Sequence, residues 1–262
     1  MKIIISPAKK MNVDTDSLAV TALPVFLEQT RILCRSVQEM TFEEAKDLWG
    51  CNEKLARLNY RRFQEMDLEG NLTPAVLSYE GLQYQHMAPG VFTWEALSYL
   101  DQHLRILSGF YGILRPFDGV TPYRLEMQAK LSPDAKETPA GAGGSSAENK
   151  KYLYGFWGRK LYEELMKENE NRTILNLASR EYSLAVEPYL TPDDRFVSCV
   201  FGELQGKKIR QKATLAKMAR GEMVRFMAEG QITDLEKLRD FKGLGFCYAE
   251  EFSTERELVF LI

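Results

Sequence analysis

The stretch from Leu107 to Leu131 concentrates residue types that could bind an anion. It reads LSGFYGILRPFDGVTPYRLEMQAKL and combines three glycines, two prolines and four aromatic residues with Arg115, Arg124 and Lys130. Glycine permits backbone conformations that are closed to other residues, and proline fixes the chain locally. Arg115 and Arg124 should therefore project from a rigid, non-helical backbone. Because the planar guanidinium group matches the geometry of phosphate, the stretch predicts a site for an anion such as phosphate.

A second concentration of positive charge lies between Gly206 and Phe226. Seven cations accompany a single acid there, a local charge of +6 in a chain whose net charge is −3. The cations are Lys207, Lys208, Arg210, Lys212, Lys217, Arg220 and Arg225. An apolar stripe predicts a helix from about Thr214 to Glu229, with Lys217 and Arg225 facing solvent and Arg220 beside the stripe. The segment is either a phosphate-contacting surface or an ordinary solvated helix face.

Polar residues also follow two predicted strands. Ser6 and Lys9 lie in SPAKK, after the predicted strand 2–5, and NLASREY (176–182) begins in the last residues of the predicted strand 173–178 and continues beyond it. Ligands bind at the carboxyl ends of strands in α/β sheets, and backbone N–H groups at such ends can hold an anion. The alternatives are a solvated turn for SPAKK and helix capping by Ser179. Neither a Walker A loop nor a nucleophile elbow is present.

The segment 241–252, FKGLGFCYAEEF, allows two interpretations. It matches a helix-hairpin-helix pattern, in which backbone amides of a hairpin bind a nucleic-acid phosphate. The alternation of residues downstream, up to ELVFLI at the end of the sequence, is typical of a β-hairpin. We favour the β-hairpin.

Composition excludes several classes of protein. The hydrophobic fraction of 45% and the charged fraction of 27% are those of an ordinary soluble globular chain, and no run of about 18 apolar residues suggests a membrane span. Four scattered cysteines without a CxxC pair argue against a disulfide framework or a zinc site, and favour the cytoplasm. With two histidines and no ligand spacing, we expect no metal site and no cofactor.

Helical and strand patterns interleave, which predicts an α/β (mixed α+β) fold in one domain, 1–262, with a mixed sheet and flanking helices. Pro24 and Asn52 should begin helices, and Thr41 with Glu44 forms a capping-box signature. Residues 73–91 look irregular. A helix capped by Thr93 should carry leucines at 97, 100, 104 and 107 and end at Gly109. The Gly/Pro/Ser-rich segment 132–151 predicts a flexible loop.

Taken in order, several of these motifs resemble the bacterial YaaA peroxide-stress family. They are ISPAK, YEGLQY, LSGFYGILRPFDGVTPYRLEM, LYGFWG, NLASREY, AKMARGEMVRFM and ELVF, and they span residues 3 to 260. The resemblance implies a cytoplasmic protein of hydrogen peroxide resistance that limits unincorporated iron, and so protects DNA and proteins. It also implies DNA binding by one compact α/β fold with a positively charged cleft and a helix-hairpin-helix element.

The resemblance carries site residues onto this sequence. Those expected at DNA or phosphate are Lys9, Arg105, Gly109, Gly112, Arg115, Arg124, Lys217, Arg220 and Arg225, and Lys208 joins them from the basic segment described above. Others expected in the cleft are Ser6, Tyr111, Tyr123, Asn176, Ser179 and Tyr182. The hairpin of the DNA-binding element is expected at Gly109–Gly112, after the leucine-rich helix.

Two functions follow from these patterns. The first is a stress protein that binds the phosphate backbone of DNA without strong sequence readout. The alternative is an enzyme that acts on a phosphate-bearing small molecule or nucleotide, with Glu126 or Glu181 as general base among the cations. Of the two, we favour DNA binding. Direct iron sequestration is the least supported reading, because the sequence has no cluster of His and Cys.

Overall fold

The computed structural model describes residues 1–131, 133, 152–206 and 208–262. The loop predicted at 132–151 lies almost entirely outside the described residues, and so does Lys207. Within the described part of the chain, no helix combines the length and the apolar composition that crossing a membrane requires.

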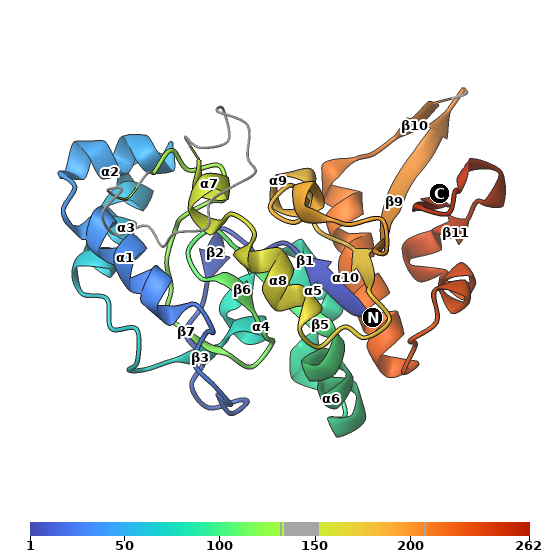
Figure 1. The fold of residues 1–262 in the computed structure, drawn as a ribbon, viewed down its shortest axis with the longest axis horizontal. Coiled ribbons are helices and arrows are strands. Elements are labelled where there is room, and N and C mark those ends of the chain that lie inside the picture. Colours follow the sequence, from blue (N-terminus) through green and yellow to red (C-terminus); the bar gives the residue numbers. More distant parts are fainter. Residues whose placement is uncertain (132, 134–151, 207) are drawn as a thin grey trace.

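A mixed eight-stranded sheet forms the centre of the molecule (Figure 1). Its order is β11-β12-β9-β8-β1-β5-β6, and β10 pairs with β9 off this path. The strands are β1 (Lys2–Ile5), β5 (Leu104–Ser108), β6 (Gly112–Leu114), β8 (Thr173–Asn176), β9 (Arg195–Gln205), β10 (Lys208–Arg210), β11 (Cys247–Tyr248) and β12 (Glu257–Leu261). Neighbours from β12 through β9, β8 and β1 to β5 are parallel, while β6, β10 and β11 are antiparallel to their partners. The predicted α/β class with a mixed sheet is confirmed.

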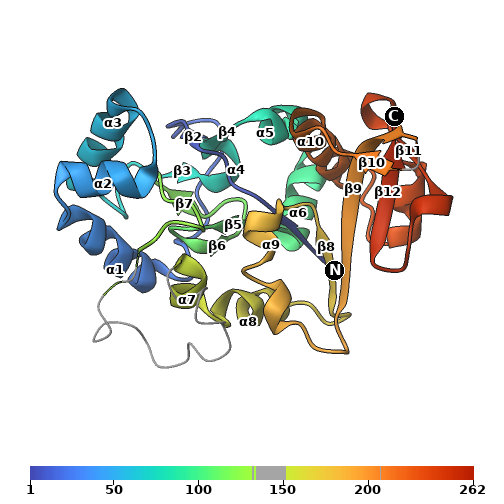
Figure 2. The same ribbon diagram turned by 90° about the horizontal axis from the view of Figure 1, so that it is seen from above.

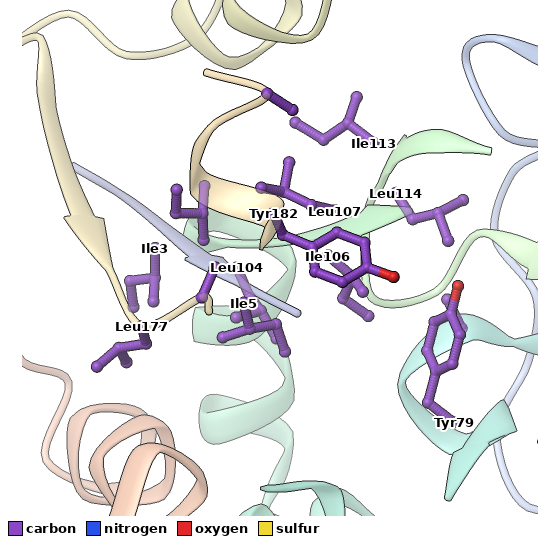
Figure 3. Close-up of a cluster of buried hydrophobic side chains, with 14 of the residues drawn as sticks. Ile3, Ile5, Tyr79, Leu104, Ile106, Leu107, Ile113, Leu114, Leu177 and Tyr182 are labelled. Atoms are coloured by element: carbon purple, nitrogen blue, oxygen red, sulfur yellow. The ribbon is translucent and has the colours of Figure 1, made fainter. Parts of the chain in front are cut away.

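The apolar runs form the strands because they are buried on both faces of the sheet. Ile3, Ile4 and Ile5 of β1 have no exposed surface, as in the buried strands of parallel sheets. Figure 3 shows β1 side chains packed with those of β5, including Leu104 and Ile106. This cluster belongs to one hydrophobic core.

Helices cover both faces of the sheet. In Figures 1 and 2, α5 (Leu82–Met87), α6 (Trp94–His103) and α10 (Ala213–Glu229) lie on one face, and α7 (Leu153–Trp157), α8 (Lys160–Met166) and α9 (Arg180–Ser183) on the other. The helices α1 (Leu27–Gln38), α2 (Phe42–Trp49) and α3 (Glu53–Gln64) form one end of the molecule. Gly221 lets α10 approach α5 closely, since a Cβ there would lie 2.1 Å from the Gln83 carbonyl oxygen.

Local signals placed several helix ends correctly. Thr41 and Glu44 form the predicted capping box of α2, and the Asn52 side chain accepts a hydrogen bond from the Leu55 amide at the start of α3. α10 begins one residue before the predicted Thr214. The first helix begins at Leu27, three residues after Pro24.

The predicted leucine-rich helix is wrong beyond His103. α6 ends there, and Leu104 and Leu107 lie in strand β5. The register Ile3↔Leu104 and Ile5↔Ile106 pairs this segment with β1. An apolar run buried on both faces fits a central strand as well as a helix, so its spacing does not decide between them.

The predicted helix-hairpin-helix at Gly109–Gly112 is also wrong. These residues connect β5 to antiparallel β6, with Ser108 opposite Gly112. The favoured β-hairpin in 241–252 is confirmed, because β11 pairs antiparallel with β12.

Residues 73–91 are not irregular but divide into short elements. They are β3 (Thr73–Pro74), α4 (Ala75–Ser78), β4 (Tyr79–Glu80), α5 and the 3₁₀ turn Pro89–Val91. β3 pairs with β7 (Gly119–Val120), and β4 pairs with β2 (Lys10–Met11). Tertiary pairing of two-residue strands leaves no periodic pattern in the sequence.

Candidate functional site

A cavity of about 400 Å³ lies beyond the carboxyl ends of β1 and β8, where the order of the sheet places them side by side. Its walls come from five segments: the loop after β1, the end of β4 with α5, the chain 123–126, the start of α9, and α10. The polar and charged side chains in the walls are Ser6, Lys9, Lys10, Glu80, Gln83, Tyr84, Tyr123, Arg124, Glu126, Ser179, Glu181, Tyr182, Lys217 and Arg220. The position agrees with the general rule for ligand sites in α/β sheets.

The floor of this cavity is held by the two loops that follow the strands. The Ser179 amide donates to Ser6 Oγ at 2.8 Å, and the Ser6 hydroxyl donates to Ser179 Oγ at 3.2 Å. The Tyr84 hydroxyl donates to the Ser6 carbonyl at 2.9 Å. The Ser6 hydroxyl therefore joins the two loops, and the Ser6 carbonyl joins them to Tyr84 of α5.

Two carboxylates form one wall. Glu126 lies 2.8 Å from the Lys9 ammonium and 3.3 Å from the Arg124 guanidinium. Glu181 accepts a weak hydrogen bond from the Gln128 amide, and burial, followed by the charge of Glu126, raises the pKa of Glu181. Gly109 lets the chain 123–126 pack closely against it, because a Cβ on Gly109 would lie 2.6 Å from the Leu125 carbonyl oxygen.

The part of the wall formed by α10 holds two cations, Lys217 and Arg220, that form no ion pair with a described residue. Among the described residues, the Arg220 side chain forms no ion pair, and its buried Nε has no hydrogen-bond partner. Burial lowers the pKa of Arg220. Exposed Lys217 is likewise in no ion pair with any described residue. Arg124 pairs with Glu126 through Nη2, but its buried Nε lacks a partner. A buried guanidinium without a counterion is unfavourable, so this wall is suited to receive an anion.

Buried tyrosines support the cavity from the core side. The Tyr123 hydroxyl lies 2.8 Å from that of Tyr79 and 2.6 Å from Ser108 Oγ. Ser108 in turn accepts the amides of Phe110 and Tyr111. Burial raises the pKa of Tyr123 to about 12, so its phenol stays protonated at neutral pH. These hydroxyls bond to one another, which makes the wall rigid.

Comparison with known proteins identifies the family. A family model described as "Peroxide stress protein YaaA" matches residues 1–252 of the chain. The chain belongs to the YaaA peroxide stress protein family. A UPF0246 protein of Pediococcus pentosaceus is 50% identical over 261 residues, which cover 100% of this chain and 98% of the relative. A UPF0246 protein of Desulfitobacterium hafniense is 51% identical over the same length, also covering 100% and 98%. The resemblance drawn from the ordered motifs is confirmed.

The YaaA-family fold gathers many of the predicted site residues in this cavity. They are Ser6, Lys9, Tyr123, Arg124, Glu126, Ser179, Glu181, Tyr182, Lys217 and Arg220. They come from four separate parts of the sequence, so the prediction that SPAK, the 107–131 stretch, NLASREY and the basic helix meet at one place is correct for these residues.

Arg105 and Arg115 lie elsewhere, contrary to the prediction of a single cleft. Both contact Glu168, at 3.4 Å and 2.9 Å, beside Lys2 at the start of β1. Antiparallel β6 carries the chain back along β5, so Arg115 lies at the amino end of that strand, away from the cavity.

The remaining predicted residues have structural neighbours outside the cavity. Gly112 lies against Trp157, and the buried Tyr111 hydroxyl accepts the Thr121 amide at 3.1 Å. Arg225 pairs with Glu229, and exposed Lys208 lies on the outer strand β10. None of these contacts provides an anion site.

Asn176 lines a second, wider hollow of about 780 Å³. Its side chain donates to Ser198 and accepts the Ala178 amide. This hollow shares Ser179 and Arg220 with the cavity and also contains Arg180 and Arg256. The two spaces therefore meet at Arg220.

Sequence reasoning missed Gln83, Tyr84 and Glu80. They belong to YEGLQY, which carries the family resemblance, but nothing in their types distinguishes them from core residues. Pairing of β4 with β2 brings this segment beside the loop after β1. No group of three or more His, Cys, Asp or Glu within the described ranges could hold a metal ion.

Proposed function

We propose that this peroxide stress family protein acts by binding a phosphate-bearing ligand in the cavity beyond β1 and β8. One observation carries the proposal: the partly buried side chains of Arg124 and Arg220 have buried, unpaired Nε atoms in the walls of one cavity. Phosphate accepts several hydrogen bonds and supplies the missing negative charge. The volume of about 400 Å³ is in the range of small-molecule sites.

The carboxylates extend the proposal to catalysis. Glu181, whose pKa is raised by burial and by the charge of Glu126, binds a proton more strongly than an ordinary glutamate and is suited to act as a proton acceptor. Glu126 pairs with Lys9 and Arg124, and so serves to hold those cations in position. In this proposal Glu181 is the general base for a ligand bound by Arg220 and Lys217.

DNA is the second candidate ligand, favoured by the hollow that adjoins the cavity at Arg220. A backbone lying along this hollow would meet Arg180, Arg220 and Arg256, while Glu187, Asp194 and Glu257 line other parts of the same hollow. Such contacts are electrostatic and weaken with salt. As part of this candidate we propose a cytoplasmic role, with bound DNA protected from iron-dependent damage. The four free thiols support a reducing compartment.

Isothermal titration calorimetry tests the proposal. The wild-type chain should bind pyrophosphate or a nucleotide, and Arg220→Met should lower the affinity by about tenfold or more, as expected for a charge-assisted contact. Arg225→Met is the matched control, because Arg225 lies on the same helix, is paired with Glu229 and is outside the cavity. If the two variants bind equally well, the cavity is not the site.

Titration with duplex DNA at several salt concentrations separates the two candidates. If DNA is the ligand, the logarithm of the affinity should fall linearly with the logarithm of the salt concentration, and Arg220→Met should reduce the slope by about one. Absence of binding at low salt excludes DNA and leaves the small ligand.

A further inference from the structure

Gln83 is a buried polar residue in the wall of the cavity. Gln83 lies on α5 and is only 6% exposed. Its Nε2 is buried and has no hydrogen-bond partner among the described residues, and the residue lines the same cavity as Arg220. A buried amide donor without a partner is unfavourable, so it is expected to bind a group that enters this cavity.

Gln83 is also held firmly in place. Gly221 packs against its carbonyl oxygen, and the next residue, Tyr84, donates its hydroxyl to Ser6. The Tyr84 ring lies 5.4 Å from that of Tyr79. The backbone that carries the amide is therefore fixed from both sides, which favours recognition with defined geometry.

The chemistry of an amide differs from that of the cations nearby. It offers one acceptor and two donors side by side, whereas phosphate at neutral pH offers almost only acceptors. The edges of nucleobases present adjacent donors and acceptors, and glutamine reads such edges with paired hydrogen bonds. Apolar atoms of Pro7, Leu82 and Leu125 in the same walls suit the flat body of a base.

We propose that the cavity takes a nucleotide, with Gln83 binding the edge of the base while Arg220 and Arg124 bind the phosphate. This inference rests on the proposed phosphate-binding function and adds the class of ligand. The same nucleotide chemistry could come from a free nucleotide or from one unit of a single strand, which could continue along the hollow beyond Arg220.

The test is calorimetry of the full chain with AMP, GMP, CMP, UMP, ribose 5-phosphate and pyrophosphate. At least one nucleotide should bind roughly tenfold more tightly than ribose 5-phosphate, the difference expected for one pair of base contacts. Gln83→Met should remove this advantage and leave binding of ribose 5-phosphate unchanged. Gln85→Met is the matched control, since Gln85 is exposed on the same helix. Gln83→Leu, which also removes the amide without adding a charge, gives the same comparison if the methionine variant does not fold.

The outcomes separate this inference from the function it rests on. If ribose 5-phosphate binds as tightly as every nucleotide, base recognition is overturned and phosphate binding stands. If neither pyrophosphate nor any nucleotide binds, the proposed small-ligand function itself fails, and DNA is the remaining candidate. A trinucleotide that binds more tightly than each mononucleotide points to a strand as the source, and equal affinity points to the free nucleotide.

Discussion

At the scale of single residues, Arg220 and Asp118 are ionisable side chains, partly or fully buried, that form no ion pair with another described residue. Arg220 in the cavity has no counterion among the described residues. Asp118 is 3% exposed, and its carboxylate accepts the Arg115 amide at 2.8 Å. Burial raises the pKa of Asp118 to about 7 despite the nearby charges of Arg115 and Arg105. The first group is expected to act in binding, and the second to make stability depend on pH.

The prediction for Asp118 concerns folding. Its pKa is near 4 in the unfolded chain and about 7 in the folded one, so the folded state binds the proton more strongly. This contribution to stability is present below pH 4 and is lost as the pH rises through 7. From pH 5 to pH 8, the unfolding free energy of the wild type should fall by up to roughly 3 kcal/mol relative to Asp118→Asn. Urea unfolding at each pH measures the difference. Parallel pH profiles for the two proteins would exclude this role.

The prediction for Glu181 concerns ligand binding. Because its pKa is raised, Glu181 takes up a proton at a higher pH than an ordinary glutamate, and the cavity becomes less negative. Affinity for pyrophosphate should therefore rise as the pH is lowered toward that pKa. Glu181→Gln should bind more tightly at pH 8, and this part of the pH dependence should disappear. Exposed Glu250→Gln, outside the cavity, is the control for a change of net charge.

At the scale of elements, pairing decides what local patterns leave open. Leu104 and Leu107 continue the helical spacing of Leu97 and Leu100. They nevertheless belong to β5, because this segment pairs in parallel with β1 in the centre of the sheet. By contrast, the capping box of Thr41 involves residues of a single helical turn, so it could be predicted from the sequence. Close contacts between helices leave no such local signal, and the contact of α10 with α5 depends on Gly221.

Gly221→Ala tests that contact. The added methyl group would meet the Gln83 carbonyl oxygen, a backbone atom that cannot turn away, so we expect a loss of about 1–3 kcal/mol in unfolding free energy. Chemical denaturation provides the measurement. Gly90→Ala is the control, because a Cβ at Gly90 has no neighbour within 4 Å. A loss of the same size in both variants would show that the helix contact is not tight.

At the scale of the whole molecule, the sequence predicted the fold class and much of the site. Ser6, Arg124, Ser179 and Arg220 are far apart in the chain, but three of them follow recognisable strands or lie in a charged helix, and the structure brings all four together. The sequence could not reveal which cations share a cavity, because that depends on the direction of β6. The positive charge is divided between the cavity at the carboxyl ends of the strands and the Arg105–Arg115 cluster at their amino ends.

This division predicts a crossed pattern of effects. The Arg105 guanidinium donates to the Asp101 and Leu104 carbonyls and is 6% exposed, so Arg105→Met should destabilise the fold by about 2–4 kcal/mol. It should leave the affinity for pyrophosphate unchanged, because Arg105 is outside the cavity. Arg220→Met should have the opposite pattern of effects. It removes a charge that has no counterion among the described residues, so the ligand-free protein should melt at the same or a higher temperature. Binding of pyrophosphate should be lost. Thermal unfolding with and without pyrophosphate measures both quantities on each variant. If Arg105→Met weakens binding as much as Arg220→Met does, the two cation clusters act as one site and the division fails.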